Sequence, residues 1–408
     1  NMKFKKYNTI TTQELNIANK VIKSGILSGF KGSVGPDSNG GVYVKRLEKN
    51  FEKYFNVKHA ITVNSWSSGL EIALTSLQLE PGSEIIVSPW TMSANVMAVI
   101  KNNLIPIFCD IDKDYFNIDV KKLSNLISKK TKAILTSDIF GQSCDVESII
   151  KIAKKYNLKI ISDSAQSIGS KYKGEYTGTL TDIGGFSFNC HKHIQSGEGG
   201  ILLTNNSSIS SKLKLLRNHA ENFTSKMKTK QLNNMVGSNY RLGEIESAIL
   251  IPQLKKLKAK LKSRNDIANA FREEFSDLNG IKMPTILNDS THSYYVFGMQ
   301  LDFKNPKPKR DKLFTKLREL NFDFMMEGYA NVHLLPIFKE KIAYGLKNKL
   351  PWSINKKHYS YLRGSCPNAE YLHNKSFIGV EMCKYEFNNN ELDYIFQKIK
   401  SIWKNLHI

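Results

Sequence analysis

One lysine of this chain, Lys192, stands in a setting that suits covalent chemistry. It lies between a short apolar run at residues 186–188 and a glycine-rich stretch at residues 197–200. A lysine that forms a Schiff base must present a neutral amine to an aldehyde, so it needs a stiff strand behind it and closely approaching backbone around it. Because the chain has 59 lysines and arginines, only this setting marks Lys192 as a candidate cofactor anchor rather than a solvated surface charge.

An acidic residue upstream strengthens this interpretation. Asp163 follows the β-branched pair Ile160 and Ile161, about thirty positions before Lys192. Pyridoxal phosphate needs a carboxylate at its ring nitrogen, because a protonated pyridinium withdraws electrons from the substrate carbanion. An aspartate at the end of a strand is often only the N-cap of the next helix. Together with Lys192, however, it predicts a site for this cofactor.

Further motifs extend the pattern over most of the chain in a fixed order. They are NSWSSGL at residues 64–70, PGSEIIV at 81–87, Asp163 with Gln166, the segment 186–200, and GSNYRL at 237–242. In this combination the sequence resembles the DegT/StrS family of pyridoxal-phosphate-dependent sugar aminotransferases. The resemblance implies the α/β architecture of fold-type I enzymes, with a mainly parallel mixed sheet flanked by helices and a smaller α+β C-terminal domain.

The resemblance also assigns roles to individual residues. It implies a Schiff base at Lys192, a pyridinium partner at Asp163 and a contact of Gln166 with the phenolic oxygen of the cofactor. Lys192 would also move the proton during amino transfer, as general base and general acid.

The phosphate group of the cofactor has its own set of matching positions. The segment that begins with Ser65 should cradle it at a helix N-terminus, where free N–H groups and the helix dipole favour an anion. Ser67 fits the family pattern best, whereas Trp66 stands where relatives usually have glycine. Ser187 matches a strand serine that also binds the phosphate. Asn239 matches a residue from the neighbouring subunit, so the resemblance implies a homodimer with shared active sites.

The residue that lies against the cofactor ring is left open. The family commonly stacks an aromatic side chain there, and alignment on Thr91 places Met92 at that position. A thioether can lie favourably against a ring. Trp90 could turn toward the cofactor instead, with packing at the start of a helix as its ordinary role.

Substrate contacts are expected from the segment 327–333, where relatives line the pocket. Tyr329 and His333 are the candidates there, with a purely structural histidine as the alternative for His333. His193, next to Lys192, is a further candidate. If strand alternation continues through this region, His191 and His193 point away from the lysine. No third ligand accompanies them, so no metal is expected.

The expected reaction is a ping-pong transamination. An amino acid, glutamate or glutamine, would give its amino group to a keto sugar, nucleotide-linked and destined for cell-surface polysaccharide or similar carbohydrate. A small phosphorylated ketone or a keto-inositol remains an alternative acceptor, because residues 379–386 lack the proline usual in sugar-nucleotide members. Family dehydratases carry histidine where this chain has Lys192, which favours transamination over dehydration. A regulator that binds the cofactor without turnover would not need the Lys192–Asp163 pair.

Length and composition agree with an enzyme of this size. A chain of 408 residues, 41% of them hydrophobic, should form two domains, which we place at residues 1–258 and 259–408. The sequence shows neither a signal peptide nor a membrane span, so a cytoplasmic location is expected. Its five cysteines form no CxxC pair, which favours reduced thiols. The net charge of +22 raises nucleic acid as a partner, but lysines at helical spacing within residues 255–262 indicate solvated helix faces instead.

The pattern of apolar residues predicts the elements that hold these side chains. Strands are expected near residues 60–63, 84–88, 105–109, 132–136, 159–162, 184–188 and 200–204, and helices near 68–78, 93–102, 120–128 and 146–156. A long helix should follow Tyr240, and the smaller domain should begin near residue 260. In that domain we expect a strand at 294–301, a loop at 304–309, and helices at 310–320 and 388–405. The glycine-rich stretch 29–41 is either a surface insertion or a cover over the site.

Overall fold

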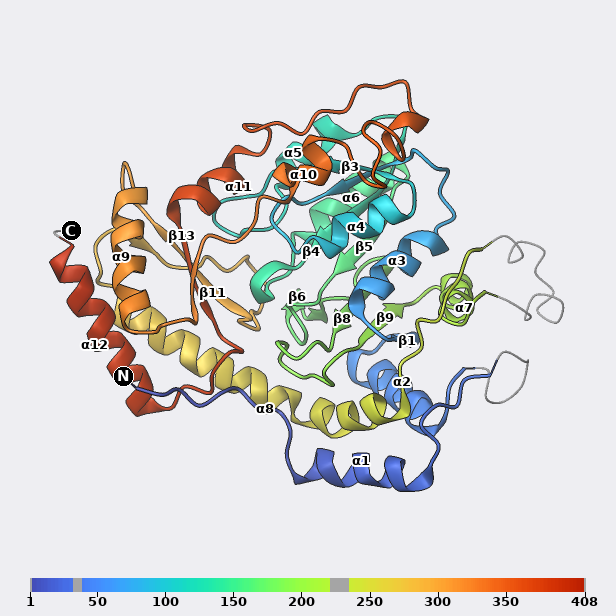
Figure 1. Cartoon of the computed structure of the whole chain (residues 1–408), viewed down its shortest axis with the longest axis horizontal. Helices are drawn as coiled ribbons and strands as arrows, with labels where there is room; N and C mark the ends of the chain where they lie inside the picture. The colour runs from blue at the N-terminus through green and yellow to red at the C-terminus, as the bar shows by residue number, and fades with distance from the viewer. Residues whose placement is uncertain (1, 32–38, 221–234, 407–408) are drawn as a thin grey trace.

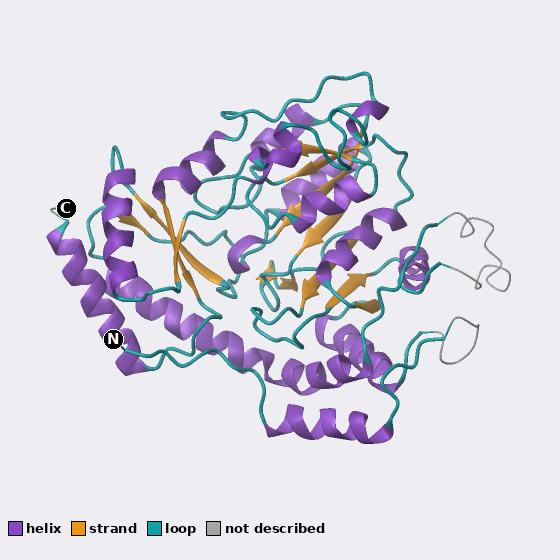
Figure 2. Cartoon of the chain, in the orientation of Figure 1, coloured by secondary structure: helices purple, strands orange, loops and turns teal. Residues whose placement is uncertain are grey.

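A seven-stranded sheet and a four-stranded sheet form the two centres of the molecule. The structure, a computed structural model, describes residues 2–31, 39–220 and 235–406. Figure 1 shows the larger sheet enclosed by helices and the smaller sheet beside it, with helix α8 (Glu244–Phe275) running below both. Figure 2, coloured by secondary structure, shows the strands of both sheets inside and the helices around them.

The larger sheet has the strand order β1-β9-β8-β5-β4-β2-β3. Its pairs β2/β3, β2/β4, β4/β5 and β5/β8 are parallel, and β9 runs antiparallel to both β1 and β8. The predicted mainly parallel mixed sheet is therefore confirmed. The strands are β1 (His59–Val63), β2 (Glu84–Val87), β3 (Ile105–Phe108), β4 (Thr131–Ser137), β5 (Lys159–Asp163), β8 (Ile183–Ser187) and β9 (Gly200–Thr204).

Helices cover both faces of this sheet. They are α2 (Val42–Phe55), α3 (Trp66–Ser76), α4 (Ala94–Lys101), α5 (Val120–Leu126), α6 (Val146–Tyr156), α7 (Ser207–Leu216) and the first half of α8. Helix α1 (Thr12–Ser24) packs against α8. In strand β2, Ile85 and Val87 belong to the cluster with α3 and α4, whereas Ile86 belongs to the cluster with α5 and α6. This alternation follows from the two-residue period of a strand. It also explains why a strand buried on both faces reads as a continuous apolar run.

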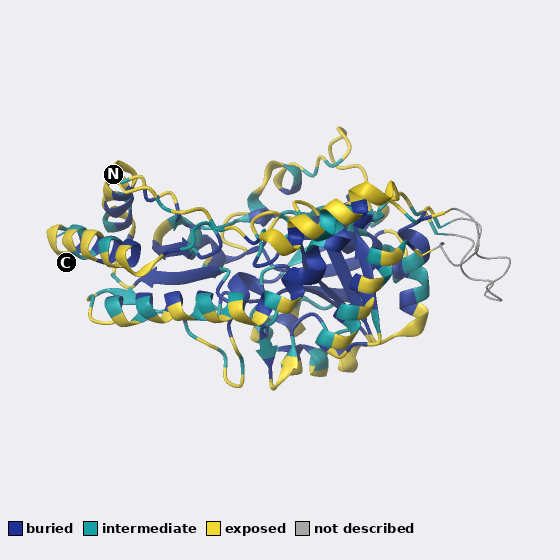
Figure 3. Ribbon diagram, turned by 90° about the horizontal axis from the view of Figure 1, so that it is seen from below, coloured by how far each residue is buried: buried dark blue, intermediate teal, exposed yellow. Residues whose placement is uncertain are grey.

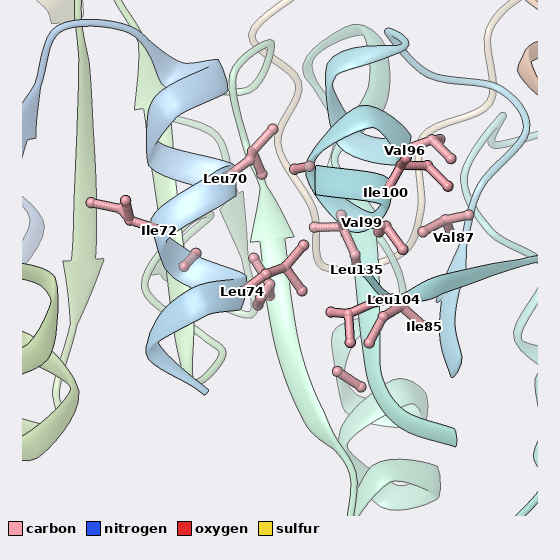
Figure 4. Close-up of a cluster of buried hydrophobic side chains, with 14 of the residues drawn as sticks. Leu70, Ile72, Leu74, Ile85, Val87, Val96, Val99, Ile100, Leu104 and Leu135 are labelled. Atoms are coloured by element: carbon pink, nitrogen blue, oxygen red, sulfur yellow. The ribbon is translucent and has the colours of Figure 1, made fainter. Parts of the chain in front are cut away.

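The contact between α3 and α4 fixes the helix that begins at the site. Figure 4 shows Leu70 and Leu74 of α3 near Val99 of α4 and Leu135 of β4. These side chains are buried, and each contributes about 1.5–3 kcal/mol by leaving water. Helix α3 therefore holds a fixed position, and its first turn is fixed with it.

The smaller sheet has the order β10-β11-β13-β12. Its strands are β10 (Ile281–Lys282), β11 (Val296–Leu301), β12 (Met325–Glu327) and β13 (Phe377–Glu381), and its main helices are α9 (Lys307–Glu319) and α12 (Asn389–Asn405). Shorter elements are α10 (Pro336–Lys339), α11 (Pro367–Tyr371) and the hairpin β6 (Lys171–Tyr172) with β7 (Glu175–Tyr176). The expected loop at 304–309 is wrong in part, because α9 already begins at Lys307. Pro308 lies in its first turn, where a missing N–H costs nothing.

The predicted domain boundary at residue 258 lies inside one continuous helix, α8 (Glu244–Phe275). Two segments cross between the two sheets. Phe4 packs into the core of the smaller sheet, and Val332, Phe338, Trp352 and Tyr361 pack into the core of the larger one. The position of the boundary stays a prediction. Figure 3 shows a buried interior below an exposed surface along most of the molecule.

The expectation of solvated lysines within residues 255–262 is confirmed only in part. Lys255, Lys258 and Lys262 are exposed, whereas Lys256 pairs with Glu14 and Lys260 lies over the ring of Tyr7.

The glycine-rich stretch 29–41 is described only at its ends, since residues 32–38 lie outside the described part of the chain. Its expected role over the site stays a prediction.

Candidate active site

The functional side chains gather at one edge of the larger sheet, where the carboxyl ends of its parallel strands meet. Asp163, the last residue of β5, pairs with Gly185 of β8, and Ser187 at the end of β8 pairs with Gly200 of β9. Gly200 also pairs with Val63 at the end of β1. The register therefore places Asp163, Ser187 and the start of α3 along the same sheet edge, which is where open α/β sheets bind ligands.

Asp163 is a buried carboxylate with several donors. Its Oδ1 accepts hydrogen bonds from Trp66 Nε1 at 2.6 Å and from the Ala165 amide at 3.1 Å. Burial raises the pKa of Asp163, while the Ala165 amide, the Trp66 indole, the charge of Lys192 and the Asn95 amide oppose that rise. The donors thus favour the charged form that a pyridinium partner needs.

Lys192 lies in the turn between β8 and β9, as predicted, and its side chain is half-buried. Burial lowers its pKa, and the nearby Asp163 and Cys383 only partly oppose this effect. Its Nζ lies 4.3 Å from the centre of the Tyr295 ring. A lowered pKa increases the fraction of neutral amine, which is the form that can attack an aldehyde.

The first turn of α3 fits an anion. Ser65 is the N-cap, and its Oγ accepts from the Ser68 amide at 3.1 Å. Within the described residues, no acceptor is recorded for the amides of Trp66 and Ser67. Ser67 is exposed, so its hydroxyl and two free amides face outward at the positive end of the helix dipole. The buried Ser187 stands across β9 from this turn.

Gln166 joins the sheet edge to the segment that carries Tyr329. Its Oε1 accepts from the Phe140 amide at 2.8 Å, and its Nε2 donates to Tyr329 Oη at 3.1 Å. Burial raises the pKa of Tyr329 to about 12. The phenol is therefore protonated near neutral pH and can donate a hydrogen bond. The structure thus brings Gln166 and Tyr329 together, and both remain candidates for contact with cofactor or substrate.

The two candidates for the ring contact differ sharply in exposure. Trp90 is completely buried and packs against Phe116, Phe140, Tyr329 and Phe377, with its Nε1 unpaired within the described residues. This packing matches the ordinary structural role considered for Trp90, and a contact with cofactor or substrate stays a prediction. Met92 is 60% exposed and remains the candidate for the ring contact.

Both histidine candidates for substrate contact are buried. The ring of His333 lies 3.0 Å from Glu370 through Nε2, and that of His193 lies 2.9 Å from the Ser293 carbonyl through Nε2. Neither side chain is exposed, which agrees with the structural alternative for His333, and contact of either ring with the substrate stays a prediction. Burial lowers the pKa of His193 to about 4, so this ring is neutral near neutral pH. Residues 188–199 form a turn rather than a strand, which also corrects the alternation expected around Lys192.

Asn239 lies on the surface beside the start of α3 in its own chain. Its backbone carbonyl accepts from Asn64 Nδ2 at 3.4 Å, and its Oδ1 accepts from Arg241 Nε at 2.8 Å. The side chain is exposed. A role across a subunit interface stays a prediction.

Two neighbours of Lys192 were not singled out from the sequence. Tyr295 lies under its ammonium group, and Cys383 interacts with it electrostatically. Both border a cavity of about 570 Å³ that Tyr7, Cys190 and His191 also line, a volume typical of small-molecule sites. The doublet Tyr294–Tyr295 in a predicted strand was the available signal, but which of the two faces Lys192 depends on register.

The donor set fits pyridoxal phosphate. It combines a lysine with a lowered pKa, a buried carboxylate at the end of β5 and a helix start with free amides. Among the described residues, no group of three or more His, Cys, Asp or Glu side chains could hold a metal ion.

Comparisons with known proteins agree with this geometry. A sequence model of the DegT/DnrJ/EryC1/StrS aminotransferase family matches residues 33–360. GDP-perosamine synthase of Vibrio cholerae is 31% identical over 76% of this chain and 84% of its own length. The dTDP-3-amino-3,6-dideoxy-alpha-D-galactopyranose transaminase of Aneurinibacillus thermoaerophilus is 35% identical over 73% of this chain and 85% of its own. An aminotransferase from Psychrobacter cryohalolentis has the same fold, with a TM-score of 0.85 at 24% identity over the whole of both chains.

Proposed function

This chain belongs to the DegT/DnrJ/EryC1/StrS aminotransferase family, and on that premise we propose that it transfers an amino group from an amino acid to a nucleotide-linked keto sugar. It is a pyridoxal-phosphate-dependent aminotransferase. We propose glutamate or glutamine as the donor and a polysaccharide or similar carbohydrate as the destination of the product.

One observation carries the assignment of the catalytic residues. Lys192 has a pKa lowered by burial, and it interacts electrostatically with the buried Asp163 at the same sheet edge. A neutral amine beside a stabilised carboxylate is the pair that this cofactor requires. We therefore assign the covalent anchor to Lys192 and the contact with the ring nitrogen to Asp163.

The cofactor, when bound, supplies an electron sink for the carbanion formed at the amino-acid carbon. Lys192 Nζ would accept the proton that leaves this carbon and later return it, as general base and then general acid. Tyr295 lies against the amine. The hydroxyls of Ser67 and Ser187 and the free amides of α3 would hold the phosphate.

The proposed acceptor follows from the relatives. The two curated relatives described above are named for a GDP-linked and a dTDP-linked amino sugar, and both align with this chain over more than two-thirds of their length. Lys192 stands where dehydratases of the family carry histidine, which supports transamination over dehydration. The net charge of +22 would also help to attract an anionic sugar nucleotide.

A screen in two stages tests this function. The purified holoenzyme is first mixed with single amino acids, and the loss of the imine absorbance reports amino transfer to the cofactor. The aminated enzyme is then offered nucleotide-linked keto sugars, a phosphorylated ketone and a keto-inositol, with mass spectrometry of the products. We expect glutamate or glutamine to react and a nucleotide sugar to gain the amino group. Exclusive amination of either of the other two acceptors would contradict the proposed substrate.

We also propose a homodimer in which Asn239 completes the phosphate site of the partner subunit. Asn239 is exposed, and its chain segment is fixed beside Asn64 at the start of α3. Mixing inactive Lys192→Ala chains with cofactor-weakened Asn239→Ala chains should form hybrid dimers. One site of each hybrid would carry both defects and the other neither, so activity should recover to about half of the wild-type value per hybrid.

The control for this complementation is each variant mixed with itself, which should remain impaired. Mass spectrometry of intact complexes shows whether hybrids form. Hybrids without recovered activity would mean that each chain completes its own site.

The location in the cell is proposed as cytoplasmic, where sugar nucleotides are substrates. No helix in the described ranges is long and apolar enough to span a membrane.

A further inference from the structure

Trp66 packs closely against two glycines of the larger sheet, Gly185 of β8 and Gly200 of β9. A Cβ added to Gly185 would come within 2.3 Å of the ring carbon Cζ3 of Trp66, and one added to Gly200 within 2.7 Å of its backbone nitrogen. Contacts this short do not occur for real Cβ atoms, so Gly185 must lack a Cβ for the ring to fit, and Gly200 must lack one for the backbone at the start of α3 to approach β9. Trp66 is only 6% exposed. Its place on the sheet is therefore fixed by β8 and β9.

The polar atom of this ring is aimed at the carboxylate of Asp163. An indole nitrogen can only donate, and Trp66 Nε1 donates to Asp163 Oδ1 at 2.6 Å. Hydrogen bonds to an ionised acceptor are shorter and about twice as strong as neutral ones. The other buried tryptophans of the described chain with a paired indole use neutral acceptors, the Tyr361 hydroxyl for Trp352 and the Asn279 carbonyl for Trp403. The bond of Trp66 is therefore the charged one.

This bond orients the carboxylate. Oδ1 already accepts from the Ala165 amide, so the indole gives the same oxygen a second donor from a different element. Two donors on one oxygen fix the plane of the carboxylate and leave Oδ2 for a third. The donors also oppose the effect of burial, which raises the pKa of Asp163.

We propose that Trp66 is a positioning residue of the active site, which holds Asp163 through Oδ1 so that Oδ2 meets the ring nitrogen of the cofactor. The inference rests on the proposed role of Asp163. Trp66 acts through the carboxylate and not by touching the substrate.

The test replaces Trp66 by phenylalanine, which keeps an aromatic ring against Gly185 and removes the N–H group. Trp352→Phe is the matched control, because Trp352 is 5% exposed and loses an equivalent buried bond to Tyr361. Both variants are loaded with cofactor labelled with ¹⁵N at the ring nitrogen. In Trp66→Phe we expect the ¹⁵N chemical shift to move toward that of the unprotonated ring, with wild-type behaviour in Trp352→Phe.

Kinetics provide the second measurement. A hydrogen bond to a charged group changes an equilibrium by about one to two powers of ten, so kcat of Trp66→Phe should fall about tenfold to a hundredfold. The KM for the amino donor should change little, since Trp66 is not proposed to contact it. Loss of packing alone would lower thermal stability in both variants without changing the ¹⁵N shift.

A double-mutant cycle with Asp163→Asn separates this inference from the proposed function. If Trp66 acts through Asp163, Trp66→Phe should have almost no further effect on kcat in the Asp163→Asn background. An unchanged ¹⁵N shift in Trp66→Phe, or full additivity, overturns the role of Trp66 while leaving that of Asp163 intact. A wild-type rate in Asp163→Asn alone overturns the proposed role of Asp163 instead.

A measurement on the unmodified chain applies if Trp66→Phe does not fold. The indole N–H signals of the ¹⁵N-tryptophan-labelled apoprotein are compared before and after cofactor is added, with Trp352→Phe and the matching variants of Trp90 and Trp403 used for assignment. The Trp66 signal should lie at low field and shift on loading, since its acceptor then shares its charge with the ring nitrogen. An indole signal that does not respond to the cofactor overturns the proposal.

Discussion

Lys192→Ala is expected to abolish transamination while the protein keeps its fold. The substitution removes the covalent anchor and the group that moves the proton, which together should lower kcat by about 10,000-fold or more. The side chain is only half-buried, in a turn between β8 and β9, so its loss opens no large cavity. Circular dichroism and thermal melting of the variant should therefore resemble those of the wild-type protein.

The position of the anchor can be tested directly in the wild-type enzyme. Reduction of the holoenzyme with borohydride followed by peptide mapping should place the cofactor on Lys192. For the loss of turnover in Lys192→Ala, the control is Lys255→Ala. Lys255 is exposed on α8, so its replacement should leave turnover unchanged. A label on any lysine other than Lys192 would refute the assignment.

The strands of the larger sheet could be predicted because each is buried on both faces. Ile85, Ile86 and Val87 are all fully buried, so the sequence shows an unbroken apolar run with turn residues at its ends. The helix start at Lys307 could not be read in the same way. Prolines normally indicate a loop, and only the structure shows that Pro306 and Pro308 stand at the beginning of α9, where their fixed φ angles are tolerated.

The residues of the site divide along a similar line. Lys192 and Asp163 could be proposed from the sequence because a strand end, and for Lys192 a glycine-rich turn, form a local pattern around them. The bond between Trp66 and Asp163 spans 97 positions, and the contact of Lys192 with Tyr295 depends on the register of a distant strand. Neither of these two contacts can be predicted from a local sequence pattern, because each joins residues that are far apart in the chain. The burial of His193 and His333 could not be predicted from the sequence either, because it depends on elements that are distant along the chain.

Asp163→Asn is expected to keep the cofactor bound and to lower the rate of amino transfer roughly a hundredfold to a thousandfold. The amide has the same shape as the carboxylate, so Oδ1 can still accept from Trp66 and Ala165, as it does in the native chain. What is lost is the negative charge, and a nearby opposite charge raises the pKa of a cationic group by about one to three units. The ring nitrogen should then lose its proton near neutral pH, and the electron sink weakens.

Asp110→Asn is the matched control, because Asp110 is also a buried carboxylate near the same sheet edge. It pairs with Lys122 and accepts from the amides of Asn368 and Ala369, so its partners belong to the fold. Single-turnover absorbance changes with the amino donor, together with the ¹⁵N shift of the labelled ring nitrogen, should separate the two variants. Asp163→Asn should lose both the rate and the protonated ring signal, whereas Asp110→Asn should lose only stability. Near-normal single-turnover transfer in Asp163→Asn would contradict the proposed role of Asp163. In that variant the negative charge that keeps the ring nitrogen protonated is gone, so transfer at the normal rate would mean that this charge is not needed.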